Sequence, residues 1–310
     1  MKAGILLPQT GESATRENVL FIAKEAEKEG LDSLWVFERL LWPIKPKTPY
    51  VATPDGSLPV QYQNVLDPLE ILTYLAGHTN QISLGTCLID MLFHNPVVLA
   101  RRFATLDVLS SGRVIAGLGI GWSKDEYEVS GIPFEHRGQR ADEFLQILKR
   151  IWTDEVVEFK GQFYSIPASK IGPKPVQKPH PPILLGGFSP KTFLRIVNYA
   201  DGWIPVAGFG SLEQLKQTID ILREDARKAN KDPSKIRIFT LAYPNVQDSS
   251  SSSEVQRLPM TGTIEQIGTD INQIKVMGVE HIIFGYAFSP LSKEMKKMVE
   301  ITKQFARFAK

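Results

Sequence analysis

A glycine pair followed by a serine and a proline is the most informative chemical feature of this sequence. The run Leu185-Gly186-Gly187-Phe188-Ser189-Pro190 follows a short apolar run and precedes a stretch with helical periodicity. Glycines let a ligand approach the backbone closely, serine is a favoured helix N-cap, and proline suits the first helical turn. The free amide N–H groups and the helix dipole at such a start favour a phosphate. We therefore expect a phosphate site here, with a tight turn that binds nothing as the alternative.

Alternating glycines form a second candidate segment, Gly117-Leu118-Gly119-Ile120-Gly121-Trp122. Side chains are missing from one face of this run, which leaves room for a flat ring or a phosphate chain beside the backbone. The spacing Gly-x-Gly-x-Gly differs from the dinucleotide-binding fingerprint Gly-x-Gly-x-x-Gly. Small residues also serve close packing, so this segment alone leaves both a ligand role and a packing role open.

Two further segments carry single reactive groups. Cys87, in Leu-Gly-Thr-Cys-Leu, is the one cysteine of the chain. A lone thiol with no base beside it is more typical of packing than of a nucleophile. Glu38 and Arg39 directly follow an apolar run. A salt bridge on the rim and a role in the site are both compatible with that position.

The motifs of several common enzyme classes are absent. The sequence has no His-Glu-x-x-His, no paired-cysteine zinc spacing and no Gly-x-Ser-x-Gly elbow. Its 5 histidines are scattered and poorly suited to a metal-centred hydrolase, so we expect no metal site. Redox chemistry needs few ionisable side chains, because a cofactor performs the hard step. The shortage of acid–base motifs therefore favours a cofactor enzyme.

The elements that must position these segments alternate between strand and helix along the whole chain. Apolar, β-branched runs are followed by amphipathic stretches, which predicts eight β–α units with parallel strands. Eight units favour an α/β fold of the closed (β/α)8 type, a TIM barrel, over an open doubly wound sheet. In such a barrel the loops after the strands carry the functional groups, and all four segments fall there. The expected strands are 3–8, 33–37, 82–88, 113–118, 183–185, 203–206, 236–242 and 281–284. The expected helices are 15–29, 67–76, 97–109, 137–153, 190–200, 212–229, 264–277 and 291–309.

Three segments depart from this alternation. Residues 156–166 predict a β-hairpin, and with the Pro-rich passage 173–182 they form an insertion after the fourth helix. The Pro-rich stretch 43–59 is too long and too polar for a tight connection, and with Trp42 and Tyr62 it is a candidate cover over a substrate. The serine run 249–253 is low in complexity, and we expect a flexible loop. No shift in composition divides the chain, so we expect one domain over residues 1–310.

Composition and charge exclude several classes of partner. The chain has 36 Lys and Arg against 34 Asp and Glu, a net charge of +2, which gives no electrostatic reason to expect nucleic acid or an anionic membrane. No run approaches the roughly 20 apolar residues that cross a bilayer, and the N-terminus lacks the features of a signal peptide. One cysteine allows no intrachain disulfide. We therefore expect a soluble, cytoplasmic protein that binds a small-molecule substrate.

The sequence resembles the luciferase-like family of flavin enzymes, and in particular its deazaflavin branch, which uses coenzyme F420. The resemblance covers nearly the whole chain, and the order and spacing of its motifs are specific although no single motif decides. It is carried by residues 30–36, 84–86, 95–107, 111–113, 117–122, 137–138, 182–187 and 200–203.

The resemblance implies a luciferase-like barrel with an insertion after the fourth helix, a homodimer, and a cofactor ring laid over the open end of the barrel. It also implies a cis peptide bond between Cys87 and Leu88, at the end of the third strand and below the ring. Cys87 then acts through its backbone rather than through its thiol.

The same resemblance implies a set of cofactor-binding residues. Those expected to line the ring or its side chain are Gly119, Ile120, Gly121 and Asp125. Those expected to hold the phosphate, in agreement with the helix-terminus argument, are Gly186, Gly187 and Phe188.

One departure from the family pattern matters for mechanism. Some sugar-phosphate dehydrogenases of this branch carry Asp-His after the second strand and Glu after the glycine-rich strand. Here these positions hold Glu38-Arg39 and Trp122. The base and the acid of those enzymes are therefore missing, and their substrate does not transfer. Glu38 remains our candidate catalytic residue, which contacts the ring or takes a proton, and Trp122 indicates an apolar or aromatic wall.

Three functions follow from these observations. The first is an F420-dependent oxidoreductase that transfers a hydride between the deazaflavin and a small organic substrate. The second is a monooxygenase that activates O2 with reduced FMN. The third, suggested by the missing His and Glu, is a cofactor-binding protein without catalysis. The sequence identifies neither the substrate nor the direction of hydride transfer.

Overall fold

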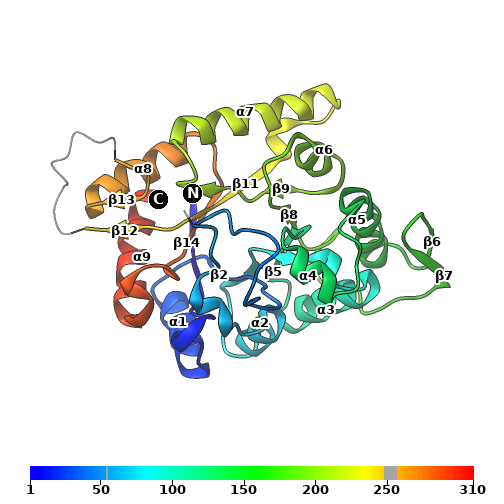
Figure 1. Cartoon of the computed structure of the whole chain (residues 1–310), viewed down its shortest axis with the longest axis horizontal. Helices are drawn as coiled ribbons and strands as arrows, with labels where there is room; N and C mark the ends of the chain where they lie inside the picture. The colour runs from blue at the N-terminus through cyan, green and yellow to red at the C-terminus, as the bar shows by residue number, and fades with distance from the viewer. Residues whose placement is uncertain (54, 248–256) are drawn as a thin grey trace.

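A closed barrel of parallel strands forms the centre of the computed structural model, which describes residues 1–53, 55–247 and 257–310 (Figure 1). Strand β1 pairs in parallel with both β2 and β14, and β9 pairs with both β8 and β11, so the ring is complete. The expected (β/α)8 barrel is confirmed. Eight strand positions, which we call staves, make up the barrel, and two of them consist of two short strands each. They are β1 (Lys2–Leu6), β2 (Ser33–Val36), β3 (Ser83–Thr86) with β4 (Ile89–Asp90), β5 (Val114–Gly119), β8 (Ile183–Leu185), β9 (Gly202–Trp203) with β10 (Val206–Ala207), β11 (Arg237–Ala242) and β14 (His281–Phe284).

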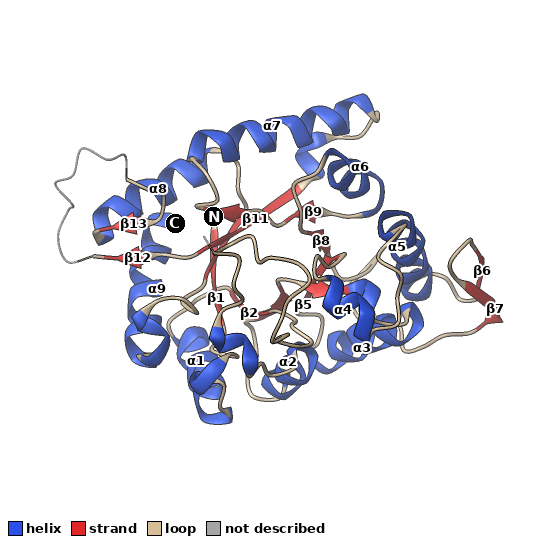
Figure 2. Cartoon of the chain, viewed as in Figure 1, coloured by secondary structure: helices blue, strands red, loops and turns tan. Residues whose placement is uncertain are grey.

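Helices cover the outside of the barrel (Figure 2). Several begin at caps that are visible in the sequence: the side chains of Thr15, Asp67, Asn95 and Ser189 each accept a hydrogen bond from an amide of the first turn. The helices that follow the staves are α1 (Arg16–Lys28), α2 (Pro68–Ala76), α3 (Pro96–Leu109), α5 (Arg137–Thr153), α6 (Pro190–Tyr199), α7 (Leu212–Lys228), α8 (Ile264–Val276) and α9 (Met295–Ala309).

Buried apolar side chains form two layers. The larger layer lies between the strands and the helices and includes Phe103, Phe144 and Ile271. The smaller layer fills the barrel itself, because alternate residues of each stave point inward. Its buried members are Leu6, Trp35, Cys87, Ile115, Leu184, Ile204, Phe239, Leu241 and Ile283. Cys87 therefore belongs to the interior of the barrel.

The structure differs from the sequence expectation in a few elements. A short helix, α4 (Lys124–Val129), lies in a segment where no helix is expected. The last helix begins at Met295 rather than at residue 291, because Pro290–Lys293 forms a separate 3-10 turn, η5. The sixth stave is split in two, and a small pair, β12 (Asn245–Val246) and β13 (Thr261–Gly262), was not expected.

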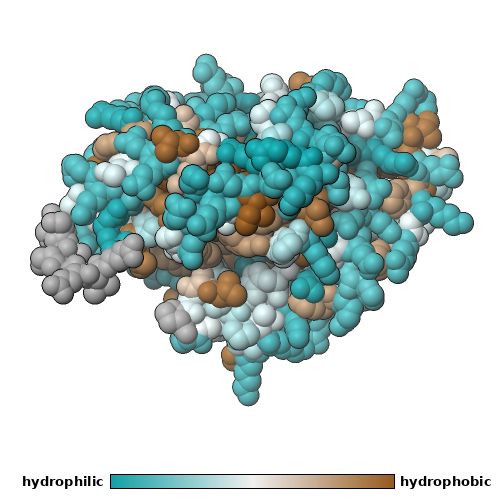
Figure 3. Space-filling model, turned by 90° about the horizontal axis from the view of Figure 1, so that it is seen from above, coloured by the Kyte–Doolittle hydropathy of each residue, from teal (hydrophilic) through white to brown (hydrophobic). Residues whose placement is uncertain are grey.

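The expected hairpin insertion is present. Strands β6 (Val157–Lys160) and β7 (Ser165–Ser169) pair antiparallel and project sideways beyond α5 (Figure 1). The serine run 249–253 lies outside the described residues. Over the described ranges no helix combines the length and the apolar character that a bilayer crossing requires. The face in Figure 3 is mostly hydrophilic, with hydrophobic side chains in small separate groups.

Candidate functional site

The peptide bond between Cys87 and Leu88 is cis, as predicted. It lies between β3 and β4 and is tied to the end of β2 on both sides. The Cys87 amide donates to the Val36 carbonyl over 2.6 Å, and the Leu88 carbonyl accepts from the Glu38 amide over 2.9 Å. The backbone around this cis bond, which we call the cis bulge, is therefore held in place by hydrogen bonds to the end of β2.

The side chain of Leu88 lies between the two glycine segments. A methyl group added at Gly119 would lie 3.3 Å from Leu88 Cδ1, and one added at Gly186 would clash with the same atom. The Gly186 amide also donates to the Leu118 carbonyl over 3.1 Å. Segments that are far apart in the sequence therefore meet at one place, above the carboxyl ends of the strands, where the sequence predicts the cofactor ring.

A cluster of polar side chains centred on Glu38 and Asp90 connects the cis bulge to the neighbouring segments. Glu38 Oε2 accepts from the Asp90 amide over 2.9 Å, and Glu38 Oε1 lies 2.7 Å from His94 Nε2. Asp90 Oδ1 accepts from the Gly121 amide over 3.0 Å and so connects the bulge to the second glycine segment. Burial, with the nearby carboxylates of Glu38 and Glu126, raises the pKa of Asp90 to about 7.

Glu38, the candidate catalytic residue, is buried, and both of its carboxylate oxygens have partners in this cluster. In this arrangement the side chain holds Asp90 and His94 in position. A role in contact with the cofactor ring stays a prediction.

Arg39 lies in a sandwich of aromatic rings. Its Nη1 pairs with Glu126 Oε2 over 2.7 Å, and its side chain is only 9% exposed. The guanidinium carbon is 5.5 Å from the centre of the Tyr62 ring and 5.2 Å from that of Trp122. Cation–π attraction and a desolvated ion pair together fix this side chain. Arg39 therefore forms a buried ion pair with Glu126 rather than an exposed salt bridge on the rim. This pair lies beside the open carboxyl end of the barrel, which we call the mouth.

The segment 43–59, expected as a cover, is docked on the unexpected helix α4. The Lys47 amide donates to Asp125 Oδ2 over 2.9 Å, and the Lys124 amide donates to Thr48 Oγ1 over 3.1 Å. Asp125, a predicted cofactor residue, is therefore used in this structure to hold the cover segment.

Aromatic rings from several loops converge under the cover segment. Tyr50 is 5.4 Å from Trp122 and 6.0 Å from Tyr62 between ring centres. Tyr62 and Tyr243 both contact Phe288, at 6.1 and 5.4 Å. The aromatic wall that Trp122 suggested is present, and it includes rings from the ends of β5 and β11 as well as from the cover segment.

A polar cavity of about 700 Å³ lies where α5 and α6 begin. Ser189, the cap of α6, and Ile120 of the second glycine segment both line it. Three cationic side chains, those of Arg137, Lys191 and Arg195, reach its wall, and Arg195 is paired there with the carboxylate of Asp142 over 2.6 Å. Two helix N-termini and the two cations outside this ion pair make the cavity an anion-binding environment.

Gly187 and Phe188, two predicted phosphate residues, precede Ser189 in the same loop but do not themselves line this cavity, and both contact Trp203. The Gly187 carbonyl accepts from Trp203 Nε1 over 2.8 Å, and the Phe188 ring packs edge-on against Trp203 at 5.6 Å. The loop before α6 is thus anchored to the sixth stave. Among the residues that the structure describes, the amides of Gly187, Phe188 and Ser189 find no acceptor, so they are available to a ligand at the helix start.

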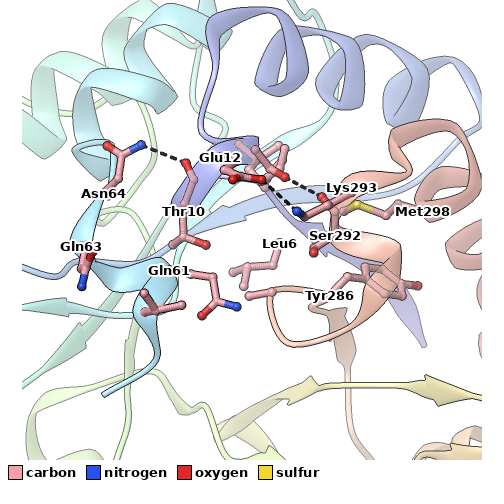
Figure 4. A pocket seen from close by; sticks show the side chains of 16 residues that line it. Leu6, Thr10, Glu12, Gln61, Gln63, Asn64, Tyr286, Ser292, Lys293 and Met298 are labelled. Carbon is pink, nitrogen blue, oxygen red and sulfur yellow. Dashed lines mark hydrogen bonds and ion pairs between the residues drawn. The ribbon is translucent and has the colours of Figure 1, made fainter. Parts of the chain in front are cut away.

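A second cavity, of about 500 Å³, lies at the carboxyl ends of β1 and β14 (Figure 4). Leu6, Tyr286 and Met298 form an apolar part of its wall, and Gln61 adds an amide. Figure 4 also shows an ion pair between the exposed side chains of Glu12 and Lys293, 2.8 Å apart, at this cavity. Its wall therefore mixes apolar surface with polar groups whose charges balance.

Sequence reasoning gave no individual role in the site to Asp90, His94, Tyr243 or Phe288, and it included Tyr50 only as part of the cover segment. The position of Asp90, just beyond an expected strand, was a usable signal, because polar groups there reach the mouth of a barrel. For Tyr243 and Phe288 the sequence holds no comparable signal. Their place depends on how separate loops pack against one another.

Comparisons with known proteins agree with the barrel fold. A model of the family described as luciferase-like monooxygenase matches residues 1–302. An uncharacterized protein of Mycobacterium tuberculosis (strain ATCC 25618 / H37Rv) is 38% identical over 184 residues, which span 59% of this chain and 65% of that protein. An F420-dependent glucose-6-phosphate dehydrogenase of Amycolatopsis mediterranei (strain U-32) is 30% identical over 253 residues, or 79% of this chain and 70% of that enzyme.

A solved structure shares the whole fold. An F420-dependent secondary alcohol dehydrogenase, in complex with an F420-acetone adduct, superposes with a TM-score of 0.79 at 21% identity. The superposition covers 100% of this chain and 99% of that one. At this level of identity the likeness concerns the fold.

Proposed function

Since the chain belongs to the luciferase-like monooxygenase family, we propose that it is an oxidoreductase that uses coenzyme F420 to transfer a hydride between the deazaflavin and a small organic substrate. The observation that carries the proposal is the polar cavity at the starts of α5 and α6, directly beside the two glycine segments. Coenzyme F420 carries carboxylates beyond its phosphate, whereas FMN ends at the phosphate. A cavity of about 700 Å³ with Arg137 and Lys191 in its wall suits the longer anionic chain.

The residues present fit such a cofactor. Gly186, Gly187 and Phe188 would hold the phosphate at the start of α6. Leu88 and the second glycine segment would support the ring, since the added methyl groups that clash there show how closely the backbone is packed. When bound, the deazaflavin supplies two-electron hydride chemistry.

The residues of the chain itself would position the cofactor ring and keep water away from it. The cis bulge and Leu88 form the platform, and the Glu38 and Asp90 hydrogen bonds keep that platform in register with the second glycine segment. The cover segment and its aromatic rings exclude water from the mouth, which strengthens the electrostatic interactions inside. Glu38 is the carboxylate that we propose to act beside the ring.

Titration of the purified protein with each cofactor tests the proposal. We expect coenzyme F420 to bind at least about tenfold more tightly than FMN, because the cations beyond the phosphate gain partners only with F420. Tighter FMN binding, with O2 consumed when the FMN is reduced, would instead establish the monooxygenase. Binding of neither cofactor would refute both. Binding of F420 without turnover of any substrate would leave the non-catalytic role.

Substitution of the two cations tests where the tail of F420, the part with carboxylates beyond the phosphate, binds. Arg137→Gln and Lys191→Gln should each weaken F420 binding by about tenfold, and should leave the affinity for the deazaflavin riboside, which lacks phosphate and tail, unchanged. Lys170→Gln, on the projecting hairpin, is the matched control and should change neither affinity. Equal loss for the riboside would place the two cations elsewhere.

A further inference from the structure

Three loops build the cavity of about 500 Å³ at the carboxyl ends of β1 and β14. Its wall includes residues of the 3-10 turns η1 (Gly11–Ser13), η2 (Val60–Gln63) and η5 (Pro290–Lys293), which follow β1, β2 and β14. Among the described residues that line it, none belongs to the set proposed to hold F420. Pockets that bind small molecules measure roughly 300–1,000 Å³, so this cavity has room for a ligand of its own.

One part of the cavity wall is apolar and well packed. Leu6, Tyr286 and Met298 line the cavity and are only 3%, 2% and 2% exposed. The Tyr286 hydroxyl lies 2.8 Å from Thr302 Oγ1, so it already has a partner and the ring is left to contact a ligand. An apolar group placed against these side chains would leave water, which favours binding.

Two neutral polar side chains face the same space. Thr10 is only 8% exposed, its hydroxyl does not cap η1, and no partner for that hydroxyl exists among the described residues. Gln61 adds a half-buried carboxamide, and Figure 4 shows both side chains around the space beside Leu6. Buried polar groups in proteins are nearly always hydrogen-bonded. A ligand with a hydrogen-bonding group would give Thr10 its partner.

The charges at the cavity determine which ligand fits. Among the described residues of its wall, Glu12 and Lys293 alone carry a charge, and they pair with each other over 2.8 Å. A second bond, from Ser13 Oγ to the Ser292 carbonyl over 2.8 Å, also joins η1 to η5. An ionised ligand would find no unpaired opposite charge here, and its own charge would lose water. The cavity therefore favours a neutral ligand.

Turn η2 connects this cavity to the mouth. Val60, Gln61 and Gln63 line the cavity, whereas Tyr62, between them, is buried on the other side of the turn. The Tyr62 ring contacts Phe37 at 5.6 Å and Phe288 at 6.1 Å, and so belongs to the aromatic wall. A ligand that contacts η2 would restrict a turn that also carries part of this wall.

We propose that this cavity is a second ligand site, for a neutral molecule with an apolar body and one amide or hydroxyl group, and that its occupant steadies η2. The apolar body would lie against Leu6, Tyr286 and Met298. The polar group would exchange hydrogen bonds with Thr10 and Gln61, which can each donate and accept. Because the cofactor residues lie elsewhere, this ligand and F420 would bind at the same time.

Three probes with the same six-carbon chain test the proposed chemistry. Hexanamide is neutral, hexanoate is an anion and hexylammonium is a cation at pH 7.5. Each is titrated by calorimetry into the full chain, with and without F420. We expect saturable binding of hexanamide, at least about fivefold tighter than that of either charged probe, and unaffected by F420.

Variants locate the bound amide. Thr10→Val and Gln61→Leu keep the size of the side chain, and each should weaken hexanamide binding by about fivefold, the loss typical for one hydrogen bond. Thr269→Val, at an exposed position on α8, is the matched control and should leave the affinity unchanged. Glu12→Gln frees Lys293 and should tighten hexanoate binding by about threefold, the size expected for an exposed ion pair.

Hydrogen exchange provides a readout at η2. Bound hexanamide should slow amide exchange in a peptide that spans residues 60–63 several-fold, and should leave a peptide from the projecting hairpin unchanged. Four results would overturn the inference: no saturable binding of hexanamide, tighter binding of a charged probe, unchanged exchange at η2, or displacement of hexanamide by F420. The last result would place the ligand in the mouth rather than in this cavity.

Discussion

Gly187 shows how a single residue determines the shape of the proposed phosphate site. Its φ of 111° lies in a region that L side chains rarely adopt, and an added methyl group would lie 3.1 Å from Thr192 Oγ1. Both effects would displace the loop before α6. The amides at the helix start would then no longer point at one anion.

We therefore expect Gly187→Ala to weaken F420 binding by about tenfold or more, as measured by cofactor titration. Gly30→Ala is the matched control, because Gly30 also has a positive φ, of 74°, but has open space around it and is far from the mouth. Both variants should lose about 1 kcal/mol of stability from backbone strain. Equal cofactor affinity in the two variants would remove Gly187 from the phosphate site.

Asp90 makes the stability of the protein depend on pH. Its folded-state pKa of about 7 lies above the ordinary value of 3.8, so the folded protein holds a proton that the unfolded chain releases. The resulting stabilisation is fully present below about pH 4 and is lost as the pH rises through 7. Relative to Asp90→Asn, the wild type should lose roughly 4 kcal/mol of unfolding free energy between about pH 4 and pH 8.

Urea unfolding across that pH range measures this difference. Asp220→Asn, at an exposed helix position, is the control and should follow the wild type. A wild type and Asp90→Asn variant with parallel pH profiles would show that Asp90 does not carry the proton.

At the scale of single residues, the sequence predicts features that consecutive residues form. It does not predict features that form only when folding brings distant residues together. The two glycine segments can be recognised because each lies within a few consecutive residues, whereas the cis bond at Cys87 was implied only by the family resemblance. The cluster around Glu38 was not found as a cluster. Its hydrogen bonds join residues 52 and 56 positions apart, so it exists only once the staves are in register.

Elements of ordinary length were predicted well, and short ones were not. The barrel staves and their covering helices follow from apolar periodicity and from caps such as Ser189, which act within one turn. Helix α4 has only 6 residues, too few to show a periodic pattern. It is held by tertiary contacts instead, above all by its link to the cover segment.

That link gives a prediction for α4. Asp125→Ala removes the acceptor of the Lys47 amide, so the cover segment should open more often and trypsin should cut after Lys47 several-fold faster. Mass spectrometry of timed digests measures the cut. Glu135→Ala, at an exposed position beyond α4, is the control and should digest like the wild type. Unchanged cleavage in Asp125→Ala would mean that other contacts hold the cover.

The whole molecule depends on closure of the ring. Strand β1 pairs with β14 from Lys2 opposite His281 to Ile5 opposite Phe284, so the first and last staves complete one another. We propose that residues 1–310 form one domain that unfolds as a unit. Circular dichroism and tryptophan fluorescence should then report the same thermal midpoint. Two separated transitions would divide the chain into independent parts.

Neighbouring positions for the first and last staves also affect how the protein is made. On the ribosome β1 emerges early, yet one of its edges has no partner until translation has passed Phe284. Until then the nascent chain carries an open strand edge and an uncovered inner layer, the features that promote misassociation. The nitrogen of Met1, which donates to the Ala309 carbonyl over 3.1 Å, gains this partner only when helix α9 has been synthesised.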